Sequence, residues 1–400
     1  MQPFMKQPMR NISFRPAALL LALFLLLPVI AGAQTTDPLT RDVDQLLAAQ
    51  DPLWVHLDGA LLKFQIPPVI VEGSTYVELN ALFTNLNITS AWNQTERKVT
   101  GTTSTGRVIE LYIGRRDAYI DGQLHWLNAA PFIATPYNRT MMPLSFVATA
   151  TGASVTWLNT PRTVDILTGV TREVTMFNLN EMSEYIFRGY QVFGEAGPIS
   201  IVNAVMAQNG SYQNVYLVGL AGTDLAAAAE GNATGLLEDL IVGGWSGEND
   251  YLKAVRNTLA AHVPSGSRLI FSGHSLGGMV AQQAAADSWI KSTYNVLHTV
   301  TIGSPLIAAG SREGEVRRTG DWNDIVPLLS VEGTILLPWQ VAGLQTEDGG
   351  YGLLGVLDAH NVSYRREDVW GAYDPVGRKW GDTTFTFWTG NVRYYPAPRL

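Results

Sequence analysis

An internal repeat within residues 52–170 constrains the fold of this chain more strongly than any other feature of its sequence. Two segments, which start at Val55 and Ala118, carry turn, aromatic and basic residues in the same order. The matched positions, first segment against second, are Asp58-Gly59 and Asp121-Gly122, Thr75-Tyr76-Val77 and Thr140-Met141-Met142, Trp92 and Trp157, and Arg97-Lys98-Val99 and Arg162-Thr163-Val164. Each segment predicts a strand, an Asp-Gly turn, a strand, a short helix and a closing hairpin.

Apolar residues at helical spacing support one helix in each unit. They are Leu79, Leu82, Phe83 and Leu86 in the first unit and Leu144, Phe146, Val147 and Ala150 in the second. Residues three or four apart share one face of a helix, so both helices should pack on a shared set of strands. Residues 52–170 are therefore expected to form a small α+β repeat domain.

This pattern resembles the small repeat domain that is named after the N-terminal domain of copper amine oxidases and is common in exported bacterial proteins. The resemblance covers about residues 52–168. The family name does not imply copper, because His56 and His125 are the only histidines of this segment and are too sparse for a metal cluster. The resemblance implies a non-catalytic module that binds a surface, and a stabilising spacer is the alternative.

Residues 1–33 are predicted to be an export signal that is cleaved after Ala33. Three basic residues precede an apolar run from Ala17 to Ile30, and a small-residue Ala-Gly-Ala follows it. A retained membrane anchor is the alternative, although an apolar run of 14 residues is short for a span. We expect a secreted or extracytoplasmic protein in which residues 34–51 form a linker.

The absence of cysteine and the modest charge exclude several classes of protein. Among 400 residues there is no Cys, which rules out disulfides, Cys-bound metals and lipid attachment at a Cys. Without the three basic residues of the signal, 24 Lys and Arg stand against 35 Asp and Glu, a net charge of −11. An acidic chain without basic clusters is a poor candidate for binding nucleic acid.

Residues 171–400 predict a second domain in which strands and helices alternate. Strand patterns occur at 214–222, 268–273 and 296–305, and helical patterns occur at 249–263 and 279–290. This alternation predicts an α/β fold with a parallel sheet and helices on both faces.

The stretch Gly273-His274-Ser275-Leu276-Gly277 lies between an apolar run and an Ala-rich run. This order of strand, sharp turn and helix is typical of a nucleophile elbow, in which the turn lifts the Ser side chain above the sheet. Gly273 and Gly277 would let strand and helix cross closely, and His274 is expected to support the turn. A turn that merely needs small residues is the alternative.

A Ser hydroxyl is a weak nucleophile and needs a base, which in this order of elements follows an acid along the chain. After Ser275, His360 lies in a loop-like context, whereas His298 falls within a buried-strand pattern. We therefore favour His360 as the base. Asp324 is favoured as the acid because the apolar residues that follow it would anchor a loop at a strand end, and Asp321 is the alternative.

Two backbone N–H groups are expected to stabilise an oxyanion. One is the N–H of Leu276, which follows the nucleophile, and the other is that of Thr223, which follows a strand and a glycine. An ordinary turn with a helix cap is the alternative for Thr223. Residues 224–248 are expected to form a mobile apolar lid or a helix packed on the sheet.

The motifs "VYLVGLAGT", "SGHSLGG", "TIGSP", "DIVP" and "AHNVSY" occur in the order seen in lipase-like α/β-hydrolases of the class 3, fungal lipase-type family. The resemblance covers about residues 175–370. It implies an α/β-hydrolase fold, the catalytic residues Ser275, Asp324 and His360, and an oxyanion hole formed by Thr223 and Leu276. The chain departs from the family at Ala221, where an Arg is usual.

We therefore expect an exported serine hydrolase that cleaves carboxylic esters, with triacylglycerols or phospholipids as substrates and with no metal or cofactor. Two alternatives are an acyltransferase or thioesterase on the same fold and a catalytically inactive surface-binding protein. Contact of the N-terminal domain with the cell surface or envelope is a further expectation.

Overall fold

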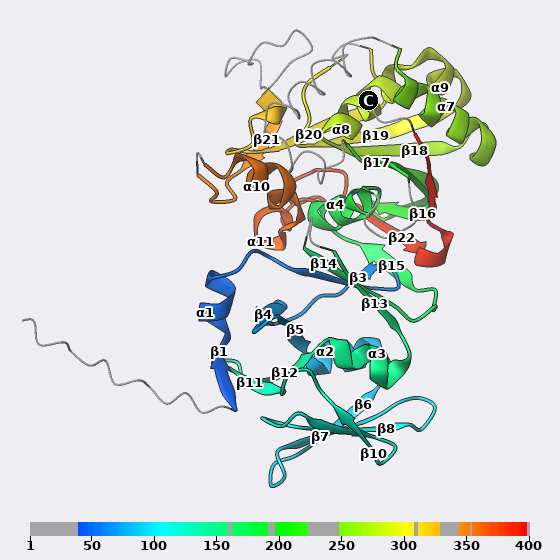
Figure 1. Cartoon of the computed structure of the whole chain (residues 1–400). Helices are drawn as coiled ribbons and strands as arrows, with labels where there is room; N and C mark the ends of the chain where they lie inside the picture. Colours follow the sequence, from blue (N-terminus) through cyan, green and yellow to red (C-terminus); the bar gives the residue numbers. More distant parts are fainter. Residues whose placement is uncertain are drawn as a thin grey trace, which may run out of the picture. The chain divides into compact units, whose positions relative to one another are not determined.

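The computed structural model describes residues 39–158, 162–190, 197–222, 248–307, 311–328, 344–352 and 354–397. Pro38–Leu400 form one compact unit that includes the repeat segment and the sheet that follows it (Figure 1). The predicted export signal lies outside the described residues. No helix among the described residues combines the length and the apolar character needed to cross a membrane.

The repeat domain consists of two units with the same order of elements. The first unit contains β2 (Trp54–Leu57), β3 (Ala60–Leu61), β4 (Val69–Val71), β5 (Ser74–Glu78), α2 (Leu79–Asn85), β6 (Thr89–Asn93) and β7 (Lys98–Thr102). The second contains β9 (Asp117–Ile120), β10 (Gln123–Trp126), β11 (Phe132–Thr135), β12 (Arg139–Pro143), α3 (Ser145–Thr151), β13 (Ser154–Leu158) and β14 (Thr163–Leu167). Both units have the predicted opening turn, helix and closing hairpin, but each has four strands before its helix where the pattern predicted two.

The two units interlock through their strands. The closing hairpin of the second unit joins the opening hairpin of the first in the sheet β13-β14-β2-β3. The closing hairpin of the first unit joins the opening hairpin of the second through β8 (Val108–Tyr112), in the sheet β10-β9-β8-β7-β6. β5 pairs with β12 so that Val77 lies opposite Met142, its equivalent in the repeat. Neither unit completes its sheets alone, so the two copies must fold together.

Part of the predicted linker is folded into the repeat domain. β1 (Thr40–Asp42) pairs in parallel with β11, and α1 (Val43–Ala48) follows it directly. Val43 is fully buried in a cluster with Ile66 and Phe132. The linker prediction was therefore wrong for residues 40–48, because burial of an apolar side chain ties this segment to the domain.

The second domain is built on a nine-stranded mixed sheet. Its main order is β15 (Glu173–Met176), β22 (Thr384–Trp388), β16 (Ile199–Gln208), β17 (Ser211–Leu220), β18 (Arg268–His274), β19 (Asn295–Ile302), β20 (Glu315–Asp321) and β21 (Leu344–Glu347), and β23 (Arg393–Tyr395) pairs with β16. The strands from β17 to β21 are parallel, and the strands from β15 to β16 are antiparallel to their neighbours. The strands expected from the sequence pattern are present, and the α/β-hydrolase assignment stays a prediction.

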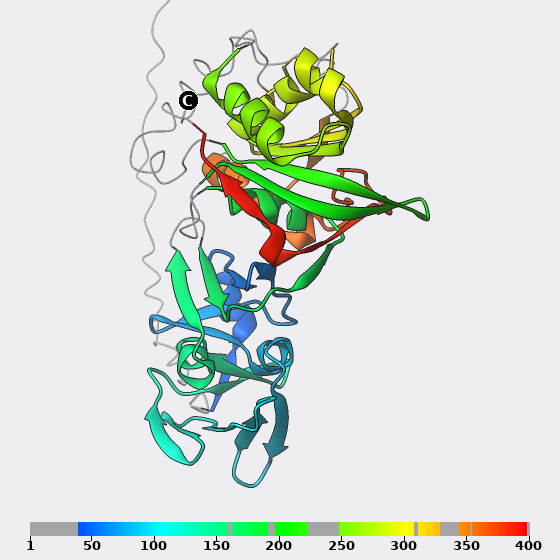
Figure 2. The same cartoon turned by 90° about the vertical axis from the view of Figure 1, so that its right-hand side faces the viewer.

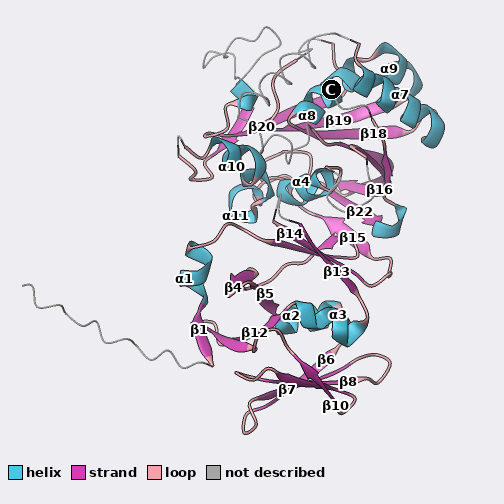
Figure 3. Cartoon of the chain, in the orientation of Figure 1, coloured by secondary structure: helices cyan, strands magenta, loops and turns pink. Residues whose placement is uncertain are grey.

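Helices cover both faces of this sheet (Figures 1, 2 and 3). One face packs against α7 (Asp250–His262), α8 (Leu276–Ala286) and α9 (Ser288–Thr293). The other face packs against α4 (Leu179–Phe187), α11 (Glu367–Trp370) and the short turn Ser363–Arg365 that follows α10 (Val356–Asn361). The helix predicted at 279–290 is divided at Asp287, whose side chain accepts a hydrogen bond from Ile290 N–H and caps α9.

The chain passes from β14 to β15 through residues 168–172, which are held to the repeat domain by Asp58. The Asp58 carboxylate accepts hydrogen bonds from the N–H groups of Thr168 and Gly169, the Thr168 hydroxyl and the Arg172 guanidinium. The Asp-Gly turn of the first unit thus anchors the connection between the domains.

Candidate active site

Ser275 occupies a strained turn between β18 and α8. Its φ is 55° and its ψ is −126°, a conformation that L-residues rarely adopt and that costs about 1–3 kcal/mol. The Ser275 N–H donates to the carbonyl of Ile302 on the neighbouring strand at 3.0 Å. The surrounding sheet therefore holds this residue in an unfavourable conformation, which is the arrangement predicted for a nucleophile elbow.

Close backbone crossings explain the two glycines that flank this serine. A Cβ at Gly273 would lie 2.3 Å from the carbonyl oxygen of Gly277, and a Cβ at Gly277 would lie 2.0 Å from that of Leu220. Neither distance can be relieved by a side-chain rotation, because the opposing atoms belong to the backbone. Strand and helix can cross here only if both positions lack side chains.

The structure brings Ser275 together with His360 and Asp324 in one line of hydrogen bonds. The Ser275 hydroxyl donates to Nε2 of His360, with 2.9 Å between the heavy atoms. Nδ1 of His360 donates to Oδ2 of Asp324 at 2.8 Å. All three residues are buried, each 1% exposed. His360 comes from α10, and Asp324 comes from the loop that follows β20.

Two further groups hold the Asp324 carboxylate. The Tyr364 hydroxyl donates to Oδ2 at 2.6 Å, and the Val326 N–H donates to Oδ1 at 2.9 Å. The Tyr364 oxygen in turn accepts from the N–H of Asp321. Burial, aided by the charge of Asp324, raises the pKa of Tyr364 well above its usual value, so the phenol stays a proton donor.

His274 lies behind the His360 backbone. Its Nε2 is 2.8 Å from the carbonyl oxygen of His360, and its Nδ1 is 2.5 Å from the Tyr190 hydroxyl. A carbonyl can only accept, so Nε2 carries the proton and Nδ1 accepts from Tyr190. Burial, together with the nearby His360, lowers the pKa of His274 well below its usual value. A neutral His274 therefore holds the backbone of α10 at His360.

The rejected candidates have other partners. The Asp321 carboxylate accepts from Ser363 Oγ and from the N–H of Gly349, not from His360. His298 lies in β19, where its Nδ1 is 3.5 Å from Glu315. The choice of Asp324 over Asp321, and of His360 over His298, is thus consistent with the geometry.

Only one of the two predicted oxyanion donors lies within the described residues. Leu276 begins α8, where backbone N–H groups have no partner within the helix, and its N–H has no acceptor among the described residues. Thr223 lies outside the described residues, as do residues 224–247 of the predicted lid. Gly222, which precedes Thr223, brings the chain close to Ser275: a Cβ there would lie 3.0 Å from Ser275 Cβ.

Sequence reasoning missed Tyr190 and Tyr364. Tyr364 lies only four residues after His360, in the short turn Ser363–Arg365 that follows α10, so closeness along the chain was the only available signal. Tyr190 has no such signal, because it reaches His274 from a segment 84 residues earlier in the chain.

Comparison with known proteins identifies only the first domain. Residues 56–166 match the family model described as the copper amine oxidase N-terminal domain, so this segment is such a domain. No curated protein and no solved structure matches the chain significantly. In the part of the chain that the structure describes, no group of three or more His, Cys, Asp or Glu side chains is placed to hold a metal ion.

Proposed function

We propose that this protein is a serine hydrolase that cleaves carboxylic esters through an acyl-enzyme. The proposal rests mainly on one observation, the hydrogen-bonded line from the Ser275 hydroxyl through His360 to Asp324. The strained backbone of Ser275 supports it, because such strain is retained where the surrounding fold maintains it and often marks a functional residue.

In the proposed reaction, Nε2 of His360 takes the proton of the Ser275 hydroxyl while Oγ attacks the carbonyl carbon of the ester. The negative charge that forms on the carbonyl oxygen is stabilised by the N–H of Leu276 and by that of Thr223. Asp324 stabilises the imidazolium and holds its tautomer. When the intermediate collapses, the C–O bond to the alcohol breaks and the leaving oxygen takes the proton from Nε2.

Water then completes the cycle. His360 removes a proton from a water molecule, which attacks the acyl carbon, and the second intermediate releases a carboxylic acid and the free Ser275 hydroxyl. His274 and Tyr190 take no part in these proton transfers. They hold the backbone of His360, and Tyr364 holds Asp324.

We infer that the substrates are lipids, such as triacylglycerols or phospholipids, and that the protein acts outside the cytoplasm. The resemblance of the motifs around Ser275, Asp324 and His360 to those of lipase-like α/β-hydrolases supports a lipid substrate. The apolar N-terminal run supports export.

Hydrolysis of nitrophenyl esters of increasing acyl length tests the proposal. Ser275→Ala should lower kcat/KM by about 10⁴-fold or more, because the nucleophile is lost. Ser272→Ala is a matched control: this serine lies on β18, is equally buried, and its hydroxyl has no partner among the described residues. The control should retain activity.

A fluorophosphonate probe separates the alternatives. It should label Ser275 in the wild-type protein and not in Ser275→Ala, as read by peptide mass spectrometry. Labelling without ester turnover would favour an acyltransferase or thioesterase. A folded protein that neither reacts with the probe nor turns over any ester would refute the hydrolase and favour a binding protein.

A further inference from the structure

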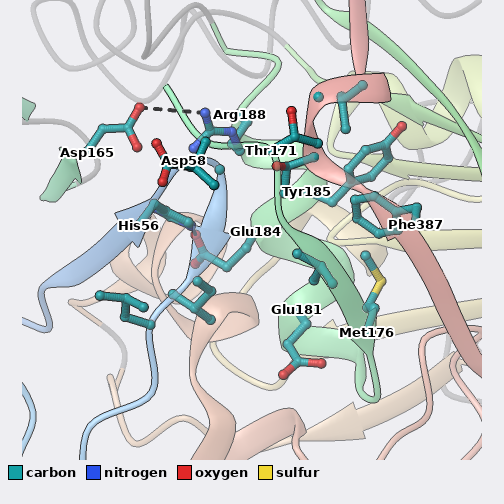
Figure 4. Close-up of a pocket in the computed structure, with 18 of the residues that line it drawn as sticks. His56, Asp58, Asp165, Thr171, Met176, Glu181, Glu184, Tyr185, Arg188 and Phe387 are labelled. Atoms are coloured by element: carbon teal, nitrogen blue, oxygen red, sulfur yellow. Dashed lines mark ion pairs between the residues drawn. The ribbon is translucent and has the colours of Figure 1, made fainter. Parts of the chain in front are cut away.

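A cavity of about 700 Å³ lies where the repeat domain meets the nine-stranded sheet (Figure 4). The repeat domain contributes residues from β2, β3 and β14, and the sheet domain contributes residues from β15, α4 and β22. None of Ser275, Asp324 and His360 lines it. Its volume is within the range of about 300–1,000 Å³ that is usual for small-molecule sites, which often occur between domains.

Three of the four acidic side chains in the cavity wall are fully engaged by the protein itself. Asp58 accepts from Thr168, Gly169 and Arg172. Glu181 pairs with Lys63 at 2.7 Å and accepts from the N–H of Phe177. Glu184 accepts two hydrogen bonds from Arg365. These carboxylates stabilise the junction between the domains and have no need of a ligand.

Asp165 differs from them. It is only 2% exposed, and its Oδ1 has no hydrogen-bond partner anywhere in the chain. Its Oδ2 lies 3.6 Å from Nη2 of Arg188, a contact that Figure 4 marks by a dashed line. A buried carboxylate oxygen without a donor costs about 1–3 kcal/mol or more, so this atom is suited to accept a hydrogen bond from a molecule in the cavity.

The opposite wall is apolar. Figure 4 shows Met176, Tyr185 and Phe387 together on the side of the cavity away from Asp165 and His56. All three are nearly buried and belong to the core on this face of the sheet. A molecule between the two walls would therefore meet hydrogen-bonding groups on one side and carbon surface on the other.

The acidic side chains that line the cavity each face a cationic side chain, so the cavity does not favour a charged ligand. Asp58, Glu181 and Glu184 each have a cationic partner, and Asp165 faces Arg188. Burial outweighs the influence of Glu184 and lowers the pKa of His56, which stays neutral. An added cation or anion would lose its hydration without gaining an unpaired opposite charge.

We propose that this cavity binds an uncharged ligand with two neighbouring hydroxyl groups, such as a sugar ring or the glycerol headgroup of a lipid. One hydroxyl donates to Oδ1 of Asp165, and the next accepts from the guanidinium of Arg188, since a hydroxyl can do both. The C–H surface of the ligand packs on Met176 and Phe387. This site is independent of the proposed hydrolysis and gives the repeat domain a part in ligand binding.

Calorimetry with the full-length Ser275→Ala chain tests the proposal, since this variant should bind without turnover. The probes are cellobiose and maltose for the sugar, 1-O-hexylglycerol for the glycerol headgroup, and hexanol as a matched compound without a diol. Hexanoate and hexyltrimethylammonium represent an anion and a cation. We expect a disaccharide or hexylglycerol to bind, and the three remaining compounds to bind at least about tenfold more weakly.

Two added substitutions locate the binding. Asp165→Asn should weaken it at least about tenfold, because a hydrogen bond to a charged acceptor is replaced by one to a neutral amide. Val174→Trp, at a half-buried position of the lining, should abolish it by filling the cavity. Asp117→Asn is the control, because Asp117 lies in the same domain, pairs with Arg115 and does not line the cavity.

Each result decides the question. Binding of a diol that is weakened by Asp165→Asn and Val174→Trp but not by Asp117→Asn supports the site, and the better probe tells sugar from glycerol. Equal binding of hexanol, preference for either ion, binding that survives both substitutions, or no binding of any probe overturns it. In the last case water alone satisfies Asp165.

Discussion

Replacement of Glu184 by Gln tests how firmly the repeat domain is joined to the sheet domain. Glu184 on α4 is 3% exposed and accepts from Nε and Nη2 of Arg365, the latter at 2.9 Å. From the repeat domain, Nε2 of His56 lies 3.2 Å from Glu184 Oε2, and the Trp54 ring stacks on the Arg365 guanidinium at 3.8 Å. The substitution removes the one negative charge that these groups share.

The pKa of Glu184 gives the size of the effect. Burial alone would raise it, but the charge of Arg365 and hydrogen bonds from His56 and Arg365 outweigh burial and lower the pKa from 4.5 to about 2. Since one pKa unit corresponds to about 1.4 kcal/mol, the charged form contributes about 3 kcal/mol to folding. Breaking a buried ion pair by removing one partner costs about 3–5 kcal/mol, which agrees.

The sign of the pH dependence follows from the depressed pKa. The contribution of Glu184 is complete above its unfolded value of 4.5 and is lost as the pH falls toward its folded value of about 2. Glu184→Gln should therefore lower the free energy of unfolding by about 3 kcal/mol at pH 7, and the difference from wild type should shrink below about pH 4.5.

Urea unfolding of the full chain, followed by tryptophan fluorescence, measures this difference. Glu72→Gln is the control, because Glu72 pairs with Arg41 on the surface, where such a pair is worth less than about 1 kcal/mol. Equal losses for the two variants, or a Glu184→Gln loss that persists unchanged in acid, would refute the reasoning.

Three further predictions concern the candidate active site. Tyr364→Phe removes a hydrogen bond to Asp324 and should lower kcat about tenfold or more with little change in KM, as ester kinetics will show. Asp324→Asn should lower kcat by about 10³–10⁴-fold because His360 loses the acceptor that fixes its tautomer, and a fold checked by circular dichroism should persist. Gly277→Ala places a Cβ 2.0 Å from the Leu220 carbonyl oxygen. It should therefore lower the free energy of unfolding and abolish labelling of Ser275 by a fluorophosphonate. Normal labelling would contradict the nucleophile elbow.

Most of what the sequence predicted about helices, strands and turns came from local patterns of residues. The repeat was visible because an Asp-Gly turn, a helical face and a closing hairpin each have a short sequence signature. The position of Ser275 was visible for the same reason, since strand, glycine-flanked turn and helix are consecutive. Two of the four strands before each helix were missed, because strands such as β4 and β11 are only three and four residues long and pair into a sheet that the local pattern does not reveal.

The order of the candidate catalytic residues along the chain predicted contacts between distant residues, which local patterns cannot do, but only for the candidate active site. His360 and Asp324 were chosen from their sequence contexts and from the order of the triad, and in the structure they lie within hydrogen-bond distance of Ser275 and of each other. Asp321, which lies only three residues before Asp324, was the close alternative for the acid. Its carboxylate turns toward Ser363 and Gly349 because the loop after β20 reverses between the two aspartates.

The sequence by itself determined the repeat, the alternation of strands and helices, and the three residues of the candidate triad, because each depends on spacing or order along one chain. Only the tertiary structure decided which groups support them. Tyr190 reaches His274 across 84 residues, and Arg365 meets Thr163 across 202 residues. Whether Oδ1 of Asp165 meets a hydrogen-bond donor likewise depends on which surface of the other domain packs against it. The packing of whole domains determines such contacts, because burial removes water and makes each unpaired polar atom energetically costly.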